Sequence, residues 1–312
     1  MTKTKEKIKF YIPDGHLEGK TLQLFKRAGF DIKISARGYN PEINDEEIEM
    51  KRLRPQDFPF VISLGKGDVG ISGSDIIKEF RLNYPENADE VVELLDLGLG
   101  RTKLAVAISG AALPGIKTIE DFKKYAREKE AKGKKIVVAS EYPKIAEEYL
   151  KGHGITAIIR KPAGKTEAWV IPPNPEADMV IDTTETGTTL DANNCIVLDY
   201  IMDATARLIA GKTALESEKK EKIMEIVQLF NGALRGSGKV NVYMDVINPD
   251  DLESIIEILD NYVKKPTISE LRGGGYDVFI VIDEKNLKYI LPKLLKKGAS
   301  HIAVSDTRMI LG

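Results

Sequence analysis

The sequence predicts an α/β protein with a two-lobed core and a smaller C-terminal domain. Strand-like apolar runs alternate with amphipathic helical segments through roughly the first two-thirds of the chain, which favours largely parallel sheets. Two strand-like runs at 91–97 and 103–109 follow each other without a helix between them, which predicts a crossing between two lobes. From residue 236 onward the order becomes β-α-β-β-α-β, which is typical of a ferredoxin-like domain.

The first lobe is expected to open with a strand at 8–12 and a helix at 17–28, whose apolar residues cluster on one side. A short strand at 31–35 follows. The helix at 55–64 begins with proline, which is tolerated there because a first-turn N–H has no helical partner anyway. A strand at 68–75 then runs into a glycine turn.

The second lobe is expected to contain a helix that starts at Thr118-Ile-Glu-Asp121, a segment resembling a capping box, and ends near Lys132. Alternating strands and helices follow. They are the strand 135–139, the helix 143–152 and the strands 157–160 and 179–182. Further strands at 196–200 and 204–209 predict the return crossing, and 216–235 predicts a long amphipathic helix.

The tail is expected to begin with a strand at 240–246 and a helix that starts at Asn248-Pro249-Asp250-Asp251 and runs to about 262. A hairpin, a helix and a last strand complete the tail. They are the hairpin strands 267–271 and 278–282 around Gly273–Gly275, the helix 286–297 and the strand 301–304.

These elements predict three domains. The first lobe takes residues 1–100 and 195–235, the second takes 101–194, and the C-terminal domain takes 236–312. Two lobes joined by two crossings form a hinged cleft, as in folds of the periplasmic-binding-protein type, and ligands in such folds bind between the lobes.

Composition excludes some classes of function. With 46 basic and 48 acidic residues the net charge is −2, whereas a non-specific nucleic-acid binder needs a basic surface. The single cysteine, Cys195, excludes an internal disulfide and a thiolate zinc cluster, and it favours a reduced, cytoplasmic setting. We expect no signal peptide, because Met1–Lys9 has no apolar core, and no membrane span.

The segment Asp178–Leu190 is the most informative stretch of the chain. An apolar run ends at Asp182, and a loop of hydroxyl residues around a single glycine follows. Backbone N–H groups and hydroxyls of Thr186–Thr189 can converge on an anion, while Asp182 can accept hydrogen bonds from sugar hydroxyls. This pattern suits a ribose 5-phosphate such as phosphoribosyl pyrophosphate (PRPP); a hydrophilic turn after a strand is the simpler alternative.

Over nearly its whole length the chain resembles the long form of ATP phosphoribosyltransferase. Short segments in a specific order and spacing carry the resemblance, although each is weak alone. They are Pro13–Leu17, Arg54–Pro59, Gly67–Gly73 with Asp75, Leu95–Gly100, Ser140–Pro143, Gly164–Glu167, Asp182–Leu190 with Ala192-Asn193, Lys265–Ser269 and Gly298–Ser300.

The resemblance implies a reaction and its control. N1 of the adenine of ATP attacks C1 of the PRPP ribose with inversion, and pyrophosphate leaves, in the first step of histidine biosynthesis. Mg²⁺ is implied as a counter-ion for the pyrophosphate. Histidine is implied as a feedback inhibitor, and a hexamer built from dimers as the assembly.

The resemblance also implies residue roles. Asp182, Glu141 and Glu167 form the catalytic set. PRPP is bound by Asp182, Glu185, Thr186, Gly187, Thr188, Thr189 and Leu190. ATP is bound by Gly15, His16, Arg54, Gly73, Ser74 and Asp75. Histidine is bound by Asp245, Thr267 and Ala299.

Other interpretations stay open for individual residues. Glu141 and Asp75 suit helix caps, Glu167 suits a solvated helix position, and Arg54 suits an ion pair with Asp57. Many relatives carry Lys-Gly-Arg-Leu where this chain has Asp14-Gly-His-Leu17, so two cations are missing there. A two-lobed binding protein and a catalytically silent paralogue are the alternatives to the enzyme.

Overall fold

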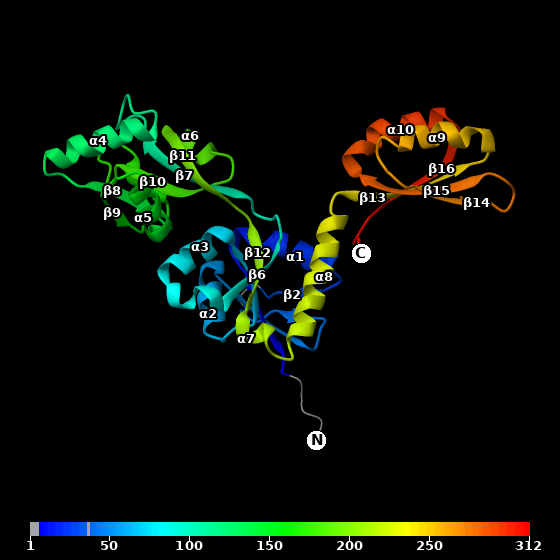
Figure 1. Ribbon diagram of the computed structural model, residues 1–312, viewed down its shortest axis with the longest axis horizontal. Coiled ribbons are helices and arrows are strands. Elements are labelled where there is room, and N and C mark those ends of the chain that lie inside the picture. Colours follow the sequence, from blue (N-terminus) through cyan, green and yellow to red (C-terminus); the bar gives the residue numbers. More distant parts are fainter. Residues whose placement is uncertain (1–5, 36–37) are drawn as a thin grey trace, which may run out of the picture. The chain divides into compact units, whose positions relative to one another are not determined.

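The computed structural model describes residues 6–35 and 38–312 (Figure 1). The chain divides into two compact units, one formed by Met1–Gln23 with Asp31–Val227 and the other by Leu24–Phe30 with Gln228–Gly312. The expectation for Met1–Lys9 concerns in part residues 1–5, which lie outside the described residues.

The first unit holds two five-stranded sheets, one for each lobe. The first-lobe sheet has the order β4-β1-β5-β12-β6, with β1 parallel to β4 and β5, and β12 antiparallel to its neighbours. Its strands are β1 (Ile8–Pro13), β4 (Ile48–Leu53), β5 (Val69–Gly73), β6 (Val91–Asp96) and β12 (Ala206–Gly211). Its helices are η1 (Gly15–Leu17), α1 (Glu18–Arg27), η2 (Pro55–Asp57), α2 (Phe58–Ser63), α3 (Ser74–Asn83), η3 (Pro85–Glu90) and α7 (Lys212–Leu215); β2 (Ile32–Lys33) pairs with β3 (Glu42–Ile43).

The second-lobe sheet has the order β11-β7-β10-β8-β9. Its strands are β7 (Thr102–Ser109), β8 (Ile136–Ser140), β9 (Ala157–Arg160), β10 (Met179–Thr184) and β11 (Cys195–Ala204). Its helices are α4 (Ile119–Ala131), α5 (Pro143–Gly152), η4 (Thr166–Val170) and α6 (Thr188–Ala192). The capping box of α4 is confirmed, because the Thr118 hydroxyl accepts from the Asp121 N–H and the Asp121 carboxylate accepts from the Thr118 N–H, each at 3.2 Å.

The chain crosses between the lobes after β6 and again after β11. β11 pairs with β7 from Cys195 opposite Ser109 to Ala204 opposite Thr102, so it belongs to the second-lobe sheet. The sequence-based division instead places 195–204 in the first lobe. The difference arises because the chain changes sheets only at Thr205, just before β12.

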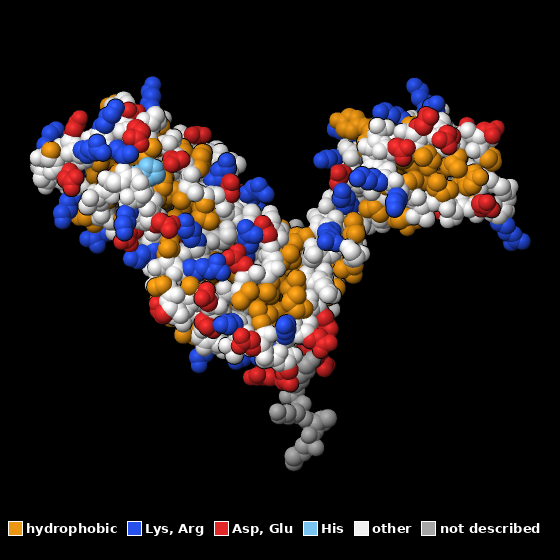
Figure 2. All heavy atoms as spheres, viewed as in Figure 1, with side chains coloured by type: hydrophobic (Ala, Val, Ile, Leu, Met, Phe, Trp, Pro, Cys, Tyr) orange, Lys and Arg blue, Asp and Glu red, His pale blue; other side chains and the backbone are white. Residues whose placement is uncertain are grey.

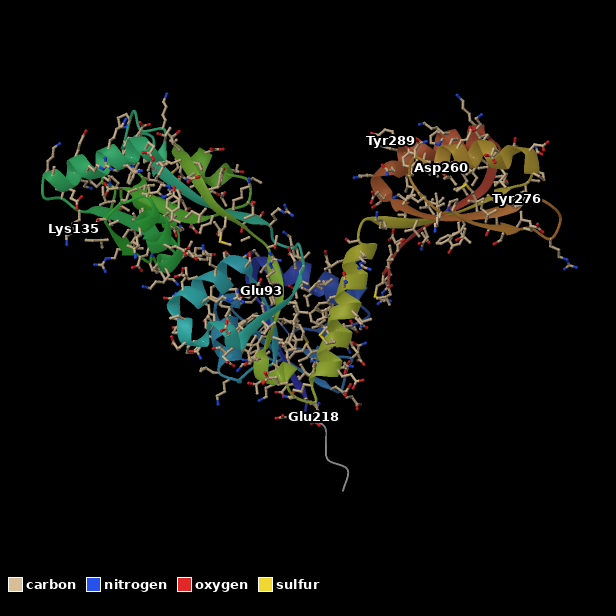
Figure 3. The ribbon with its side chains drawn as sticks, viewed as in Figure 1. Glu93, Lys135, Glu218, Asp260, Tyr276 and Tyr289 are labelled. Carbon is tan, nitrogen blue, oxygen red and sulfur yellow. The ribbon has the colours of Figure 1, made fainter. Side chains whose placement is uncertain are left out.

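The second unit contains the ferredoxin-like domain that the sequence predicts. After α8 (Lys220–Gly236), an antiparallel sheet of order β14-β15-β13-β16 forms, and α9 and α10 cover one of its faces (Figure 1). Its elements are β13 (Lys239–Val246), η5 (Pro249–Asp251), α9 (Leu252–Leu259), β14 (Thr267–Glu270), β15 (Tyr276–Asp283), η6 (Glu284–Asn286), α10 (Leu287–Lys296) and β16 (Ala299–Asp306). Tyr276, labelled in Figure 3, marks the start of β15.

The two ends of this domain meet. The N–H of Thr307, just after β16, donates to the carbonyl of Lys239 at the start of β13, at 3.1 Å. The last residues then run back along α8, where the Ile310 N–H donates to the Gly232 carbonyl at 2.9 Å. A Cβ at Gly236 would lie 2.9 Å from the Cα of Met309, so glycine is needed in α8 for the tail to approach this closely.

In the first lobe, β4 and α3 differ from the expectation. β4 was not predicted, because it is an edge strand in which buried Ile48 and Met50 alternate with charged residues over only six positions. α3 was not predicted either. The sequence predicts a strand at 68–75 that runs into a glycine turn, whereas Gly73 has extended backbone and is the N-cap residue of a ten-residue helix.

The surface carries no dominant charge on the face that Figure 2 shows, where acidic and basic side chains are interspersed. Glu93 in the first lobe, labelled in Figure 3, illustrates this mixing because it pairs with Arg81 at 2.8 Å and lies 3.7 Å from Arg207. Within residues 6–35 and 38–312, none of the helices has both the length and the apolar character needed to span a membrane.

Candidate active site

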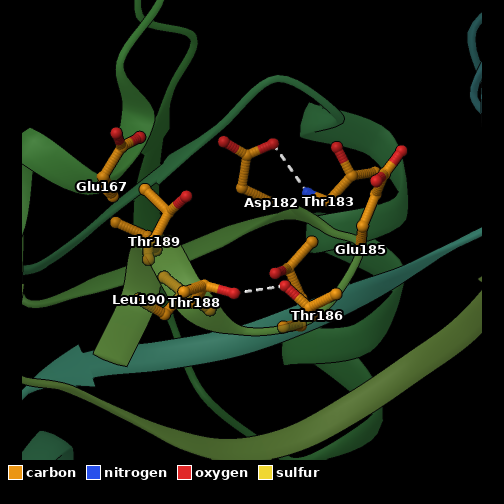
Figure 4. A pocket seen from close by; sticks show the side chains of 11 residues that line it. Glu167, Asp182, Thr183, Glu185, Thr186, Thr188, Thr189 and Leu190 are labelled. Carbon is orange, nitrogen blue, oxygen red and sulfur yellow. Dashed lines mark hydrogen bonds between the residues drawn. The ribbon is translucent and has the colours of Figure 1, made fainter. Parts of the chain in front are cut away.

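The loop after β10 lines a cavity of about 420 Å³ in the second lobe (Figure 4). β7, η4, β10 and α6 all contribute to its wall. The lining residues are Ala105, Glu167, Val180, Asp182, Thr183, Thr184, Glu185, Thr186, Thr188, Thr189 and Leu190. The structure therefore brings together around one space most of the residues that the sequence assigns to PRPP.

Internal hydrogen bonds shape the loop. Gly187 has φ of 81°, a left-handed conformation that favours glycine, and its N–H donates to the Thr184 hydroxyl at 2.9 Å. The hydroxyls of Thr186 and Thr188 bond to each other (Figure 4). The helix α6 that follows has only five residues, so its dipole is short and the loop's own polar groups dominate the local field.

Asp182 is the most perturbed carboxyl group in this cavity. Burial raises its pKa from 3.8 to about 6, and the negative charges of Glu141 and Glu167 act in the same direction. The N–H of Thr183, which donates to Asp182 Oδ1 at 2.7 Å, opposes that shift. A carboxylate held this way has a strong preference for a ligand that donates hydrogen bonds to it.

A second cavity, of about 310 Å³, lies between the two lobes. The first lobe contributes His16, Arg54, Gly73 and Asp75 to its wall, and the second contributes Glu141. Gly15 and Ser74 lie beside it rather than in its lining. A Cβ on Gly15, which has φ of 79°, would lie 3.4 Å from Arg54 Nη1, and the Ser74 hydroxyl accepts from the Thr205 N–H at 3.2 Å.

Asp75 binds a partner from the other lobe. The Tyr142 hydroxyl donates to Asp75 Oδ2 at 2.6 Å, and both side chains are buried. Burial, and then the charge of Asp75, raise the pKa of Tyr142 well above its ordinary value, so the tyrosine stays a donor. A Cβ at Gly73 would lie 2.2 Å from Asp75 Oδ1, so glycine leaves the space in which this carboxylate sits.

Arg54 pairs with a residue that the sequence analysis did not consider as its partner. Its Nε lies 3.4 Å from Asp14 Oδ1, whereas its carbonyl accepts the Asp57 N–H, so the expected ion pair with Asp57 is not the one formed. The Arg54 side chain is 70% exposed, which makes the pair weak. Asp14 thus stands near Arg54, an arginine in the wall of the interlobe cavity.

The three residues assigned to histidine do not surround one space in this domain. Asp245 lies on β13 and its carboxylate is 3.1 Å from His301 Nδ1. Ala299 begins the neighbouring edge strand β16 and pairs with Val246. Thr267 begins β14, the opposite edge of the sheet, where it pairs with Phe279.

Sequence reasoning missed several residues at the interlobe cavity, among them Tyr142, Thr183 and Thr205. Tyr142 lies inside the segment Ser140–Pro143 that carries the resemblance, which was the available signal. Thr205 offers no signal in the sequence, because its importance comes from being the residue at which the chain changes sheets.

The chain has two α/β lobes joined by two crossings, a cavity between the lobes and a hydroxyl-rich loop in the second lobe. These features define a two-lobed ligand-binding fold of the periplasmic-binding-protein type. The model of the family described as HisG, ATP phosphoribosyltransferase, matches residues 54–232. An ATP phosphoribosyltransferase from Archaeoglobus fulgidus is 42% identical over 81% of this chain and 88% of its own length. One from Thermodesulfovibrio yellowstonii is 37% identical over 95% and 96%.

The chain therefore belongs to the ATP phosphoribosyltransferase family. It catalyses the first step of histidine biosynthesis, in which ATP and PRPP give N1-(5-phosphoribosyl)-ATP and pyrophosphate. A solved structure, the ATP phosphoribosyl transferase (HisG:HisZ) complex from Thermotoga maritima, shares the fold with a TM-score of 0.55 at 20% identity. That match covers 72% of this chain and 98% of that one.

Proposed function

We propose that the loop after β10 holds PRPP, that the interlobe cavity holds ATP, and that the two substrates react where the cavities adjoin. One observation carries this proposal: Thr183 lines both cavities. A ribose bound by Asp182 would thus lie beside the wall of the ATP cavity. The reacting atoms could approach each other without passing through the protein.

The carboxylates suit the chemistry of this reaction. The ribose gains positive charge at C1 as pyrophosphate departs, and Asp182, Glu141 and Glu167 place negative charge around that position. Ionised Asp182 accepts hydrogen bonds from the ribose 2- and 3-hydroxyls and so fixes the face that N1 of adenine attacks. Polar groups of Thr186, Thr188 and Thr189 surround the 5-phosphate, while buried Leu190 anchors the loop.

Mg²⁺ fits this site as a partner of the substrate rather than of a protein cage. In residues 6–35 and 38–312 no three His, Cys, Asp or Glu side chains converge to hold a metal. Mg²⁺ commonly keeps several waters and binds substrate phosphates. We therefore propose that it arrives on the pyrophosphate of PRPP, where it neutralises the charge of the leaving group.

The loop assignment is tested by Gly187→Ala. An added Cβ strains the left-handed backbone at φ of 81° and should displace the loop, so PRPP affinity should fall at least tenfold, measured by isothermal titration calorimetry. Gly133→Ala is the matched control, because Gly133 has φ of 72° and a Cβ there would meet no atom within 4 Å. It carries the same backbone strain between α4 and β8, and it should leave PRPP binding unchanged. Equal PRPP affinity in the two variants would contradict the assignment.

We also propose that the C-terminal domain binds histidine as a feedback inhibitor. Thr267 and Ala299 begin opposite edge strands, so a ligand touching both requires a second copy of the domain. This need supports the hexamer built from dimers that the resemblance implies. ATP consumption and the single thiol Cys195 support a cytoplasmic location.

A further inference from the structure

Helix α5 of the second lobe begins without a cap of its own. Its N-cap residue, Tyr142, makes no side-chain capping hydrogen bond, and Pro143 at the first helical position has no N–H to donate. The N–H groups of Lys144 and Ile145 are the next two donors of the first turn. Such groups have no partner inside a helix and need an acceptor from elsewhere.

Glu79, on α3 of the first lobe, supplies that acceptor. Its two carboxylate oxygens accept from the Lys144 N–H at 2.9 and 3.1 Å, and Oε2 also accepts from the Ile145 N–H at 2.9 Å. The Asn83 side chain, one turn further along α3, donates to Glu79 Oε1 at 3.0 Å and orients the carboxylate. A negatively charged group at this position also interacts favourably with the positive end of the α5 dipole.

Glu79 belongs to the face of α3 that meets the start of α5, because its carboxylate accepts from the Lys144 and Ile145 N–H groups. One turn earlier on that face, Asp75 accepts from the Tyr142 hydroxyl. The adjacent residue Lys78 pairs with Glu148 at 2.7 Å, but both of these side chains are well exposed. Asp75 makes a buried contact, and Glu79 makes a half-buried bond to the Ile145 N–H besides its exposed bonds to the Lys144 N–H. Both residues act on the first turn of α5 or on the residue before it.

We propose that Glu79 is a positioning residue for the reaction, because it caps α5 across the lobe boundary and so holds the interlobe cavity in its reactive shape. Glu141 and Tyr142 immediately precede α5 and line that cavity opposite His16, Gly73 and Asp75. Separation of the lobes would strip the cap from α5. The cap therefore stabilises the closed arrangement relative to an open one.

The two cavities differ in a way that makes the proposal testable. The cavity around the PRPP loop is lined only by residues of the second lobe, whereas the interlobe cavity is lined by both lobes. Loss of the cap should therefore weaken the use of ATP and spare the binding of PRPP alone. A general loss of stability would instead affect both substrates together.

The experiment compares Glu79→Ala, Glu79→Gln and Lys78→Ala by steady-state kinetics and PRPP calorimetry. Removing a helix cap typically changes an equilibrium by about fivefold, so Glu79→Ala should raise the KM for ATP by about that factor at saturating PRPP. Its PRPP dissociation constant should stay within about twofold of wild type. Glu79→Gln keeps a carbonyl acceptor and should restore part of the effect. Lys78→Ala removes an exposed ion pair at the same boundary and should change neither quantity.

An unchanged KM for ATP in Glu79→Ala would overturn the proposal, as would a parallel loss of PRPP affinity in Glu79→Gln. The inference rests on the proposed assignment of the interlobe cavity to ATP. The Gly187→Ala comparison tests the substrate sites separately. If Gly187→Ala loses PRPP affinity as expected while Glu79→Ala leaves the KM for ATP unchanged, the proposed role of Glu79 is wrong and the substrate sites stand.

Discussion

Asp182 links binding to pH at the scale of a single residue. Its pKa of about 6 means that the carboxylate needed for the ribose hydroxyls loses its charge below that pH. We expect PRPP affinity of the wild type to fall as pH drops from 7 to 5. Asp182→Asn, which cannot ionise, should bind PRPP weakly and show a smaller pH dependence over that range, which comes from the 5-phosphate of PRPP itself, whose second pKa is about 6. A wild-type PRPP affinity that stays constant down to pH 5 would contradict this role.

The same shift predicts the direction of a stability change. The folded state holds the Asp182 proton more tightly than the unfolded chain, whose pKa is near 3.8. Stability from this group is therefore fully present below pH 3.8 and is lost as pH rises through about 6. A shift of this size corresponds to as much as about 3 kcal/mol. Urea unfolding at pH 4 and pH 7 should show this loss in the wild type and not in Asp182→Asn.

Single residues were predictable where their chemistry lies in local sequence. The loop from Asp182 to Leu190 is continuous in the chain, and its residue types alone indicated a site for an anion and a sugar. The contact between Asp75 and Tyr142 joins positions 67 residues apart, so only the fold brings them together. The pair of Arg54 with Asp14 was missed for the same reason.

Among the elements, α4 offers a clean test of a sequence signal. Thr118→Ala removes the hydroxyl that accepts the Asp121 N–H, and it should lower the free energy of unfolding by about 1 kcal/mol. Thr156→Ala, at an exposed position between α5 and β9, should leave that free energy within about 0.5 kcal/mol of wild type. Urea denaturation followed by circular dichroism measures both. Equal stability of the two variants would show that the capping box contributes little.

Elements were predictable where a periodic apolar pattern is long or a terminus has a distinct signal. The helices at α4, α5 and α8 and most central strands satisfy that condition. β4 does not, because an edge strand buries one face only, and its charged positions weaken the pattern. α3 was hidden by Gly73, which resembles the glycine of a turn. Glycine is needed there because the buried Asp75 carboxylate occupies the space that a Cβ would fill.

For the whole molecule, the C-terminal domain can be excised without opening a gap in the chain, because its two ends lie next to each other. Deleting residues 239–306 and joining Gly238 to Thr307 through about three glycines should keep the tail on α8. We expect this protein to form phosphoribosyl-ATP, followed by its ultraviolet absorbance, and to be insensitive to histidine. Deleting 237–312 would also remove the tail that packs along α8 beside Gly232, and should lower the melting temperature further. Histidine inhibition that survives the excision would place the inhibitor site elsewhere.

The paired ends of the C-terminal domain also have a mechanical consequence. A domain attached through a single segment of chain can rotate about every backbone bond of that segment. Here the chain enters the domain at Lys239 and leaves it at Thr307, and these two residues lie side by side. The segment that leaves is held on α8 by the hydrogen bond to the Gly232 carbonyl and by the close approach at Gly236. Twisting about such a double attachment is resisted, while bending across it stays soft. An event at the sheet would thus reach α8 as a tilt about one axis rather than as an arbitrary reorientation.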